Sequence, residues 1–209
     1  MANYNKPDFW TLKARKEGYP ARSVYKLREL DEKFGLLPKG GSGGASPPFR
    51  VLELGAAPGS WSLYVLRTLR ERGFLAAADL APLSRRYDGG LFDRDNFFFI
   101  QGDITGADTR DALLNRGPYR LLLSDAAPAT TGSRQIDTLR SLELAETALD
   151  YAGAVLAQGG NMVVKVFQGG DTAFLLKRIR EFFKTGKSFK PMVCRRESFE
   201  TYYVGLDKK

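Results

Sequence analysis

Short apolar runs, each followed by polar or glycine-rich residues, recur along most of the chain. Such runs are typical of buried β-strands, and five strands are expected at residues 50–54, 74–79, 96–101, 119–124 and 161–167. Stretches with helical spacing lie between them, at residues 60–72, 108–115, 134–156 and 172–183. Because near-continuous apolar strands alternate with helices, the pattern predicts an α/β fold with a mostly parallel sheet covered on both faces.

Both ends of the chain extend this pattern. Apolar residues at helical spacing predict an amphipathic helix over residues 21–34, whose other face carries Arg22, Lys26, Arg28 and Lys33. Two runs around residues 188–194 and 201–206 have no long helix between them, so an antiparallel hairpin should complete a seven-stranded sheet. The Gly/Ser/Pro-rich residues 40–48 predict a connector. We therefore expect a basic helical extension with its connector over 1–48 and one compact Rossmann-like domain over 49–209.

Composition narrows the class of protein. The chain has 209 residues, 43% hydrophobic and 27% charged, which is ordinary for a globular domain. No apolar run approaches the ~18 residues of a membrane span, and residues 1–9 lack the apolar segment of a secretory signal. The single cysteine, Cys194, excludes an internal disulfide framework. These features predict a cytoplasmic protein with no membrane partner.

Histidine is absent from the sequence. Its absence removes the commonest general base, the commonest metal ligand and every nucleophile that depends on a Ser-His or Cys-His pair. Proton transfer would have to use Asp, Glu, Lys or Tyr, or be left to solvent, and no metal site is expected.

The net charge of +8 is unevenly distributed. Residues 1–28 have a net charge of +5 and residues 177–196 a net charge of +7, so the remainder is negative at −4. Two basic regions form a surface for a polyanion if the fold brings them together. Two ordinary solvated faces explain the charge equally well.

A glycine-rich turn follows the first predicted strand, in Val51-Leu-Glu-Leu-Gly-Ala-Ala-Pro-Gly-Ser-Trp61. A strand that enters such a turn and then a helix is typical of the nucleotide-binding crevice of a doubly wound sheet. The spacing is Gly55-x-x-Pro58-Gly59 rather than Gly-x-Gly-x-x-Gly, which favours a nucleoside with an amino-acid tail over a dinucleotide pyrophosphate.

Two carboxylates end the next strands. Asp79 is placed to accept both ribose hydroxyls and Asp103 to accept from an adenine amino group. Either aspartate alone is more often a turn or cap residue. With the glycine-rich turn they occupy successive strand ends of one sheet, and together they predict an adenosine ligand.

Two further polar residues lie at the strand ends where chemistry gathers in open α/β sheets. Asp125 follows the fourth strand, and Lys165 interrupts the apolar fifth strand. A lysine among valines is costly unless it is ion-paired or functional, or unless it reaches solvent at the strand end.

The sequence resembles the FtsJ-type ribosomal RNA large-subunit 2′-O-methyltransferases over nearly its whole length. The resemblance is carried by Arg22-Ser-Val-Tyr-Lys-Leu27, Leu54-Gly-Ala-Ala-Pro-Gly-Ser-Trp61, Ser124-Asp-Ala-Ala-Pro128, Val163-Val-Lys-Val-Phe-Gln-Gly169 and Ser198-Phe-Glu-Thr-Tyr-Tyr203. It departs from the family at Glu53 and Ser60, where Asp and Gly are common, and in a longer connector at residues 40–48.

This resemblance implies a class I methyltransferase fold that uses S-adenosylmethionine, with S-adenosylhomocysteine as the product. It implies a catalytic tetrad of Lys26, Asp125, Lys165 and Glu200, with Glu197 as a nearby rival for Glu200. The implied cofactor contacts are Gly55, Ala56, Ala57, Pro58, Gly59, Trp61, Asp79, Leu80, Asp103, Ile104 and Asp125.

The implied reaction is in-line methyl transfer to a ribose 2′-hydroxyl of RNA, with a uridine of large-subunit ribosomal RNA as the expected target. Free RNA or the ribosomal particle is the expected partner of a monomeric enzyme. Lys165 would serve as base or oxyanion stabiliser; Lys26 favours its losing a proton, whereas Asp125 and Glu200 oppose that loss. Transfer RNA or an mRNA cap are alternative substrates. An inactive RNA-binding module is another reading, while the missing Gly-x-Gly-x-x-Gly disfavours a dehydrogenase.

Overall fold

A computed structural model describes residues 7–38, 47–169, 172–194 and 198–209. In these ranges one seven-stranded sheet has the order β3-β2-β1-β4-β5-β7-β6. Its first five strands are parallel, while β7 runs antiparallel to both β5 and β6. The strands are β1 (Phe49–Leu54), β2 (Gly73–Asp79), β3 (Phe97–Gln101), β4 (Tyr119–Ser124), β5 (Leu156–Phe167), β6 (Phe183–Phe189) and β7 (Glu200–Lys208).

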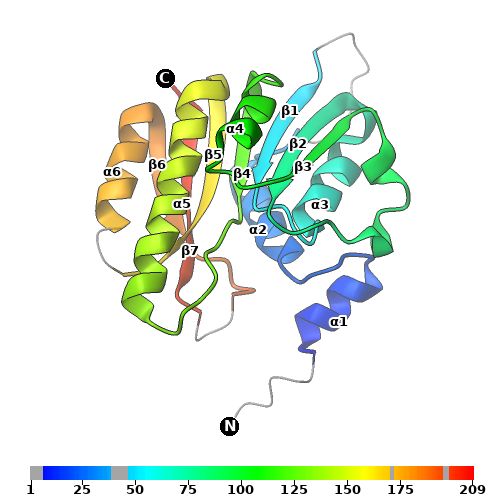
Figure 1. The fold of residues 1–209 in the computed structure, drawn as a ribbon, viewed down its shortest axis with the longest axis horizontal. Helices are drawn as coiled ribbons and strands as arrows, with labels where there is room; N and C mark the ends of the chain where they lie inside the picture. Colours follow the sequence, from blue (N-terminus) through cyan, green and yellow to red (C-terminus); the bar gives the residue numbers. More distant parts are fainter. Residues whose placement is uncertain (1–6, 39–46, 170–171, 195–197) are drawn as a thin grey trace.

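Helices cover both faces of the sheet (Figure 1). The α-helices are α1 (Phe9–Lys16), α2 (Val24–Phe34), α3 (Ser60–Leu69), α4 (Ala107–Leu114), α5 (Arg134–Val155) and α6 (Thr172–Phe182), and the short 3-10 turns are η1 (Arg70–Arg72), η2 (Arg85–Tyr87) and η3 (Leu91–Asp93). Parallel strands alternating with helices, with the order reversing between β1 and β4, make a doubly wound Rossmann-like fold, as predicted.

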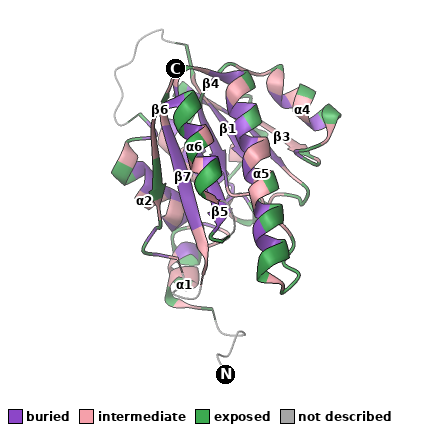
Figure 2. Ribbon diagram, turned by 90° about the vertical axis from the view of Figure 1, so that its left-hand side faces the viewer, coloured by how far each residue is buried: buried purple, intermediate pink, exposed green. Residues whose placement is uncertain are grey.

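The core lies in two layers separated by the sheet. One layer packs α1, α2 and α3 against side chains such as Val51, Leu121 and Val163, and the other packs α4, α5 and α6 against alternate residues such as Leu52 and Leu122. Figure 2 shows the central strands buried between helices with exposed outer sides. Because both faces of β1, β4 and the second half of β5 are covered, these segments are mostly apolar, which is why the sequence predicts them as strands.

The C-terminal hairpin lies at the sheet edge as expected, but the prediction for its first strand was wrong. β6 begins directly after α6 and ends at Phe189, five residues earlier than the run 188–194 suggested. Pro191 has no N–H for a ladder, and Glu29 of α2 accepts from the main-chain N–H groups of Met192 and Val193. The segment after Phe189 is therefore bound to α2 rather than paired in the sheet, with Val193 buried and Met192 91% exposed. β5 is also longer than predicted, beginning at Leu156.

The N-terminal segment contains a helix that the apolar pattern did not predict. α1 begins after Asp8, whose carboxylate accepts from the main-chain N–H of Thr11. The predicted helix over 21–34 is shorter, beginning at Val24. Figure 1 shows α1 projecting below the body of the molecule, while α2 lies behind the sheet. Most of the connector predicted at residues 40–48 lies outside the described residues.

The two basic regions meet only in part. Arg22 donates to the Val193 carbonyl, and Lys33 lies 4.4 Å from the ring centroid of Phe189. The end of the second basic region thus lies against α2. Its beginning lies on α6, where Arg178 pairs with Glu146 and Asp150 of α5. None of the helices in the described ranges is both long and apolar enough to cross a membrane.

Candidate active site

Asp125 and Lys165 meet at the carboxyl ends of β4 and β5. Lys165 Nζ lies 3.1 Å from Asp125 Oδ1 and also donates to the Asp125 main-chain carbonyl. The Lys165 side chain is only 8% exposed. The two residues that strand-end placement singled out are therefore an ion pair, which explains how an apolar strand accommodates a lysine.

Lys26 and Glu200 form the second ion pair of the site. Lys26 extends from the first turns of α2, and its Nζ lies 2.6 Å from Oε1 of Glu200 at the start of β7. Both side chains are mostly buried, at 12% and 14% exposure. The four residues that the family resemblance implied as a tetrad are thus two adjacent ion pairs. The rival carboxylate, Glu197, lies outside the described residues.

The charges of the two pairs act on each other. Burial disfavours the ionised form of Asp125, but the Lys165 and Lys26 ammonium groups hold its pKa below the usual value. Burial likewise opposes the charge on Lys26, whereas Asp125 and Glu200 raise its pKa above the ordinary value. Lys26 also keeps the pKa of Glu200 low despite burial. The carboxylates therefore stay ionised over the whole physiological pH range.

Tyr202 is a fifth member of this cluster, which the sequence reasoning missed. It lies directly opposite Lys165 in the β5–β7 ladder, and its hydroxyl donates to Asp125 Oδ1 at 2.7 Å. Burial, followed by the nearby Asp125 and Glu200 carboxylates, raises the pKa of Tyr202 well above its usual value, so it remains a donor. A two-residue alternation from Glu200 along β7 would have placed it on the same face.

Replacing Tyr202 by phenylalanine is expected to move the titration of the Asp125 carboxyl upward by up to about one pH unit. The hydroxyl stabilises ionised Asp125, so its removal raises the pKa of that carboxyl, and the carboxylate is protonated at a higher pH as pH falls. The NMR chemical shift of the Asp125 carboxyl carbon, followed against pH, measures this. Tyr203→Phe, on the opposite face of β7, is the matched control; an equal shift in both variants would contradict the assignment.

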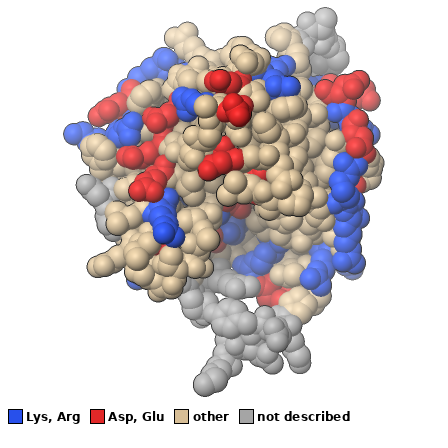
Figure 3. Space-filling model, in the orientation of Figure 1, with Lys and Arg blue, Asp and Glu red and all other residues tan. Residues whose placement is uncertain are grey.

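A cavity of about 410 Å³ lies beside the tetrad, at the carboxyl ends of β1 to β4. Of the predicted cofactor residues, Gly55, Asp79, Leu80, Asp103 and Ile104 line it. Its opposite wall is formed by Ala126 and its neighbours after Asp125, so the cavity reaches the edge of the tetrad. Figure 3 shows a recess in the lower middle of this face with Lys and Arg side chains beside it.

Asp79 and Asp103, two of the carboxylates that line the cavity, are fixed by main-chain donors. Asp79 accepts from the N–H of Ala57 at 2.8 Å and from the N–H of Ala81 at 2.8 Å. Asp103 accepts from the main chain and hydroxyl of Thr105, which lowers its pKa. These contacts give both aspartates a structural role in turns. Both residues also line the cavity, where a ligand could reach them.

The other predicted contacts do not line the cavity. Ala56, Ala57, Pro58 and Gly59 form the turn between β1 and α3, in which Gly59 N–H donates to the Ala56 carbonyl. Trp61 is buried in the core: its indole N–H donates to the Ser23 carbonyl, and its ring packs on Tyr202. A cofactor contact from Trp61 therefore stays a prediction, while its packing role is clear.

Ser60 and Trp61 together attach the beginning of α2 to α3. The Ser60 hydroxyl accepts from the N–H of Ala21 and donates to its carbonyl, at 2.8 and 3.1 Å. With the Trp61 bond to Ser23, these contacts fix the three residues before α2. Ser60, one of the two departures from the family pattern, thus helps to position the helix that carries Lys26.

Glu53, the other departure, is fully buried in β1. Burial raises its pKa to about 8, and one carboxyl oxygen accepts from the Ser62 hydroxyl at 2.7 Å. It does not line the cavity, so it joins β1 to α3 behind the glycine-rich turn.

The remaining wall of the cavity comes from α5 and was not predicted. Arg140, Glu143, Leu144 and Thr147 line it from one face of that helix. Their spacing of three, four and seven residues is the periodicity of a helix face, but nothing in the sequence said which face would look into the cavity. The described residues contain no group of three or more Cys, Asp or Glu side chains arranged to hold a metal ion.

Comparisons with known proteins agree with this geometry. The chain is 50% identical over 207 residues to "Ribosomal RNA large subunit methyltransferase E" of Treponema denticola, covering 99% of this chain and 97% of the relative. It is 42% identical to the protein of the same name from Treponema pallidum strain Nichols, covering 98% and 95%.

Among solved structures, a protein described as a ribosomal RNA methyltransferase from Plasmodium falciparum superposes with a TM-score of 0.73. It is 26% identical, and the match covers 91% of this chain and 98% of that one. The fold is therefore that of the class I methyltransferases. A sequence model described as FtsJ-like methyltransferase matches residues 19–208, and the chain belongs to this family.

Proposed function

We propose that the protein transfers a methyl group from S-adenosylmethionine to a ribose 2′-hydroxyl of RNA. The observation that carries the proposal is the pair of coupled ion pairs, Lys165–Asp125 and Lys26–Glu200, at the edge of a cavity lined by Asp79 and Asp103. The protein has no histidine, and a lysine held between a carboxylate and a main-chain carbonyl is positioned for general acid–base catalysis.

The residues around the cavity suit an adenosine ligand with an amino-acid tail. Its volume of about 410 Å³ is within the range for small-molecule sites. Asp79 and Asp103, at the carboxyl ends of β2 and β3, offer carboxylate oxygens for ribose hydroxyls and an adenine amino group. Gly55 lets the main chain of β1 approach the ligand. When bound, S-adenosylmethionine would supply an electrophilic methyl carbon on a cationic sulfur.

Each tetrad residue then has a defined task. Lys165 Nζ takes the proton of the ribose hydroxyl after releasing one of its own to solvent, and it lies at the strand end next to the cavity. Asp125 and Tyr202 fix its position. The Lys26 ammonium, held by Glu200, attracts the RNA backbone. Positioning of the hydroxyl about 3 Å from the methyl carbon contributes the remainder of the rate enhancement.

Large-subunit ribosomal RNA is the proposed substrate, and a uridine its proposed target. The name shared by the bacterial relatives, which match this chain over nearly their full lengths, supports ribosomal RNA as the substrate. The uridine is proposed from the family resemblance alone. The enzyme would act in the cytoplasm as a monomer, on RNA or on the ribosomal particle.

Incubation with tritiated S-adenosylmethionine tests the proposal. Separated large and small ribosomal subunits, transfer RNA and capped RNA are offered in parallel, and the methylated position is mapped by resistance to alkaline hydrolysis. Label on a 2′-oxygen of large-subunit RNA is the expected result. Label on transfer RNA or a cap would replace the substrate but keep the chemistry, whereas label only on a base or a protein would refute the reaction.

The basic face of α2 should contribute to RNA affinity. Lys33 lies seven residues after Lys26, on the same face of α2 and about 10 Å further along its axis. Replacing Lys33 by glutamine should weaken RNA binding and reduce the slope of log affinity against log salt by about 0.7. Lys177→Gln on α6 removes the same charge elsewhere and serves as the control. Equal slopes in wild type and Lys33→Gln would favour an ordinary solvated face.

A further inference from the structure

An aromatic ring next to the tetrad is only partly buried. Phe199 directly precedes Glu200, and its ring packs edge-on against Phe167, with 4.8 Å between centroids and 67° between planes. The main-chain N–H of Gln168 donates to the Phe199 carbonyl at 2.7 Å, which fixes the backbone there. The ring is therefore held in place while part of its surface faces solvent.

A guanidinium group lies over the same ring. The Arg134 guanidinium carbon is 5.5 Å from the Phe199 centroid, and Arg134 also donates to the Gln168 carbonyl at 3.4 Å. Arg134 is exposed and is the first residue of α5, where the helix dipole disfavours a positive charge. A cation kept at an unfavourable helix position, stacked on an aromatic ring, suits an anionic or planar partner.

This pair is within reach of one nucleotide bound at the site. Phe167 lies two residues after Lys165 on the same face of β5, about 7 Å along the strand, and is paired with Glu200 in the ladder. Phe199 extends from Phe167 toward the beginning of α5. A base whose ribose lies at Lys165, or the base of the neighbouring RNA nucleotide, can therefore contact Phe199 and Arg134.

We propose that Phe199 and Arg134 form a stacking platform for an RNA base within one nucleotide of the methylated ribose. The proposal rests on the proposed function, because it requires RNA at the tetrad. Single-stranded RNA is held by its bases stacking on aromatic rings and guanidinium planes, and arginine adds attraction for the phosphates. Stacking tolerates any base, so the platform sets the position of the nucleotide rather than its identity.

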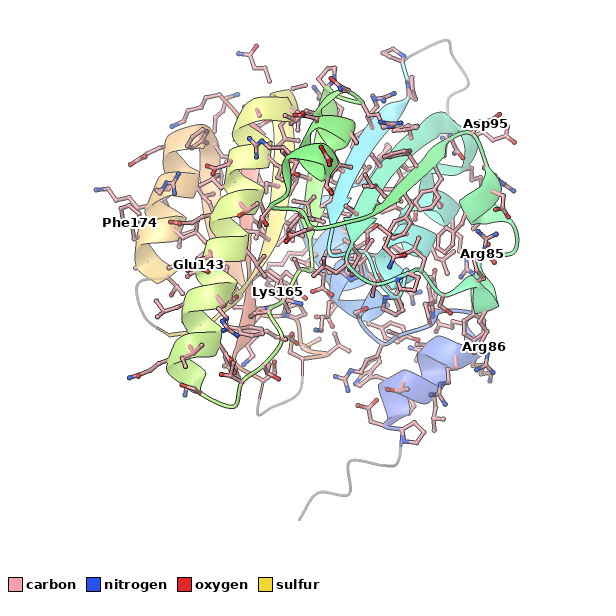
Figure 4. All side chains as sticks on the ribbon, in the orientation of Figure 1. Arg85, Arg86, Asp95, Glu143, Lys165 and Phe174 are labelled. Carbon is pink, nitrogen blue, oxygen red and sulfur yellow. The ribbon has the colours of Figure 1, made fainter. Side chains whose placement is uncertain are left out.

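Three variants test the platform. Phe199→Leu keeps apolar bulk against Phe167 but removes the π-surface, and Phe199→Trp restores it. Phe174→Leu is the matched control: Phe174 is 50% exposed on the outer side of α6, and Figure 4 shows it away from Lys165. The measurements are KM and kcat for methylation of unmethylated large ribosomal subunits, affinity for a fluorescein-labelled oligouridine, and affinity for S-adenosylhomocysteine.

We expect Phe199→Leu to raise the KM for RNA and weaken oligouridine binding by about ten-fold, while S-adenosylhomocysteine affinity stays unchanged. Phe199→Trp and Phe174→Leu should behave as wild type. Wild-type RNA affinity in Phe199→Leu would overturn the platform and leave the proposed function intact. A wild-type protein that binds oligouridine but methylates no RNA would overturn the proposed function; the platform would then stand or fall on whether Phe199→Leu weakens that binding.

Discussion

Replacing Lys165 by arginine is expected to lower kcat for RNA methylation at least about 100-fold, because a positioned general base contributes roughly 10²- to 10⁴-fold. Arginine keeps the positive charge and can still pair with Asp125, but it cannot give up its proton in a protein. Only the proton transfer proposed for Lys165 Nζ should therefore be lost. Affinity for S-adenosylhomocysteine, measured by calorimetry, should change little, since Lys165 does not line the cavity.

The control for this substitution is Lys187→Arg, on the exposed edge strand β6 of the same sheet. It should leave kcat, cofactor affinity and the unfolding transition unchanged. Because Lys165 is 8% exposed, the longer guanidinium group can also disturb packing, so the unfolding midpoint of Lys165→Arg has to be recorded. A folded Lys165→Arg protein with full activity would reject the base role and leave stabilisation of the developing oxyanion as its task.

The fold was predictable because its central strands are buried on both faces and its helices separate them. The misplaced strand at the hairpin shows where this signal ends. β6 is an edge strand with Lys184, Thr185 and Lys187 in its middle, so no apolar run marks it. In the run at 188–194, Phe189 is the last residue of β6 and Val193 is buried beyond the strand, whereas Met192 is 91% exposed. The apolar residues of this run therefore mark neither the bounds of the strand nor uniform burial.

The site was predictable to the extent that each residue violates the pattern around it. Asp125 and Lys165 are charged groups at the ends of apolar strands, so their placement alone indicates a functional or ion-paired role. Lys26 lies among other basic residues of an amphipathic helix, and only its contact with Glu200, 174 residues away in sequence, distinguishes it. That contact depends on Ser60 and Trp61 attaching the beginning of α2 to α3. Lys26 and Glu200 could therefore be predicted as site residues only from the family resemblance, because local sequence patterns do not show contacts between such distant residues.

Gly55→Ala is expected to weaken S-adenosylhomocysteine binding at least about ten-fold and to lower the free energy of unfolding by more than the roughly 1 kcal/mol of a strained glycine site. Gly55 has a φ of +76°, which disfavours any side chain. A Cβ there would also lie 2.5 Å from both the Cα and N of Ala126. Ala126 follows Asp125 and lines the cavity. The clash must therefore move the β4 loop and disturb the cavity and the tetrad together.

Gly90→Ala separates strain from clash. Gly90 has a nearly equal φ of +78°, but its Cβ would meet nothing within 4 Å. That variant should lose about 1 kcal/mol of stability with cofactor affinity and kcat unchanged, because only backbone strain is added. Calorimetric titration with S-adenosylhomocysteine and thermal unfolding of both variants measure the difference. If Gly55→Ala lost no more stability than Gly90→Ala and bound S-adenosylhomocysteine as tightly as wild type, the close approach of β1 to the Asp125 loop would not be what shapes the cavity. A selective loss in Gly55→Ala would mean that one glycine sets the separation between the cofactor cavity and the catalytic carboxylate.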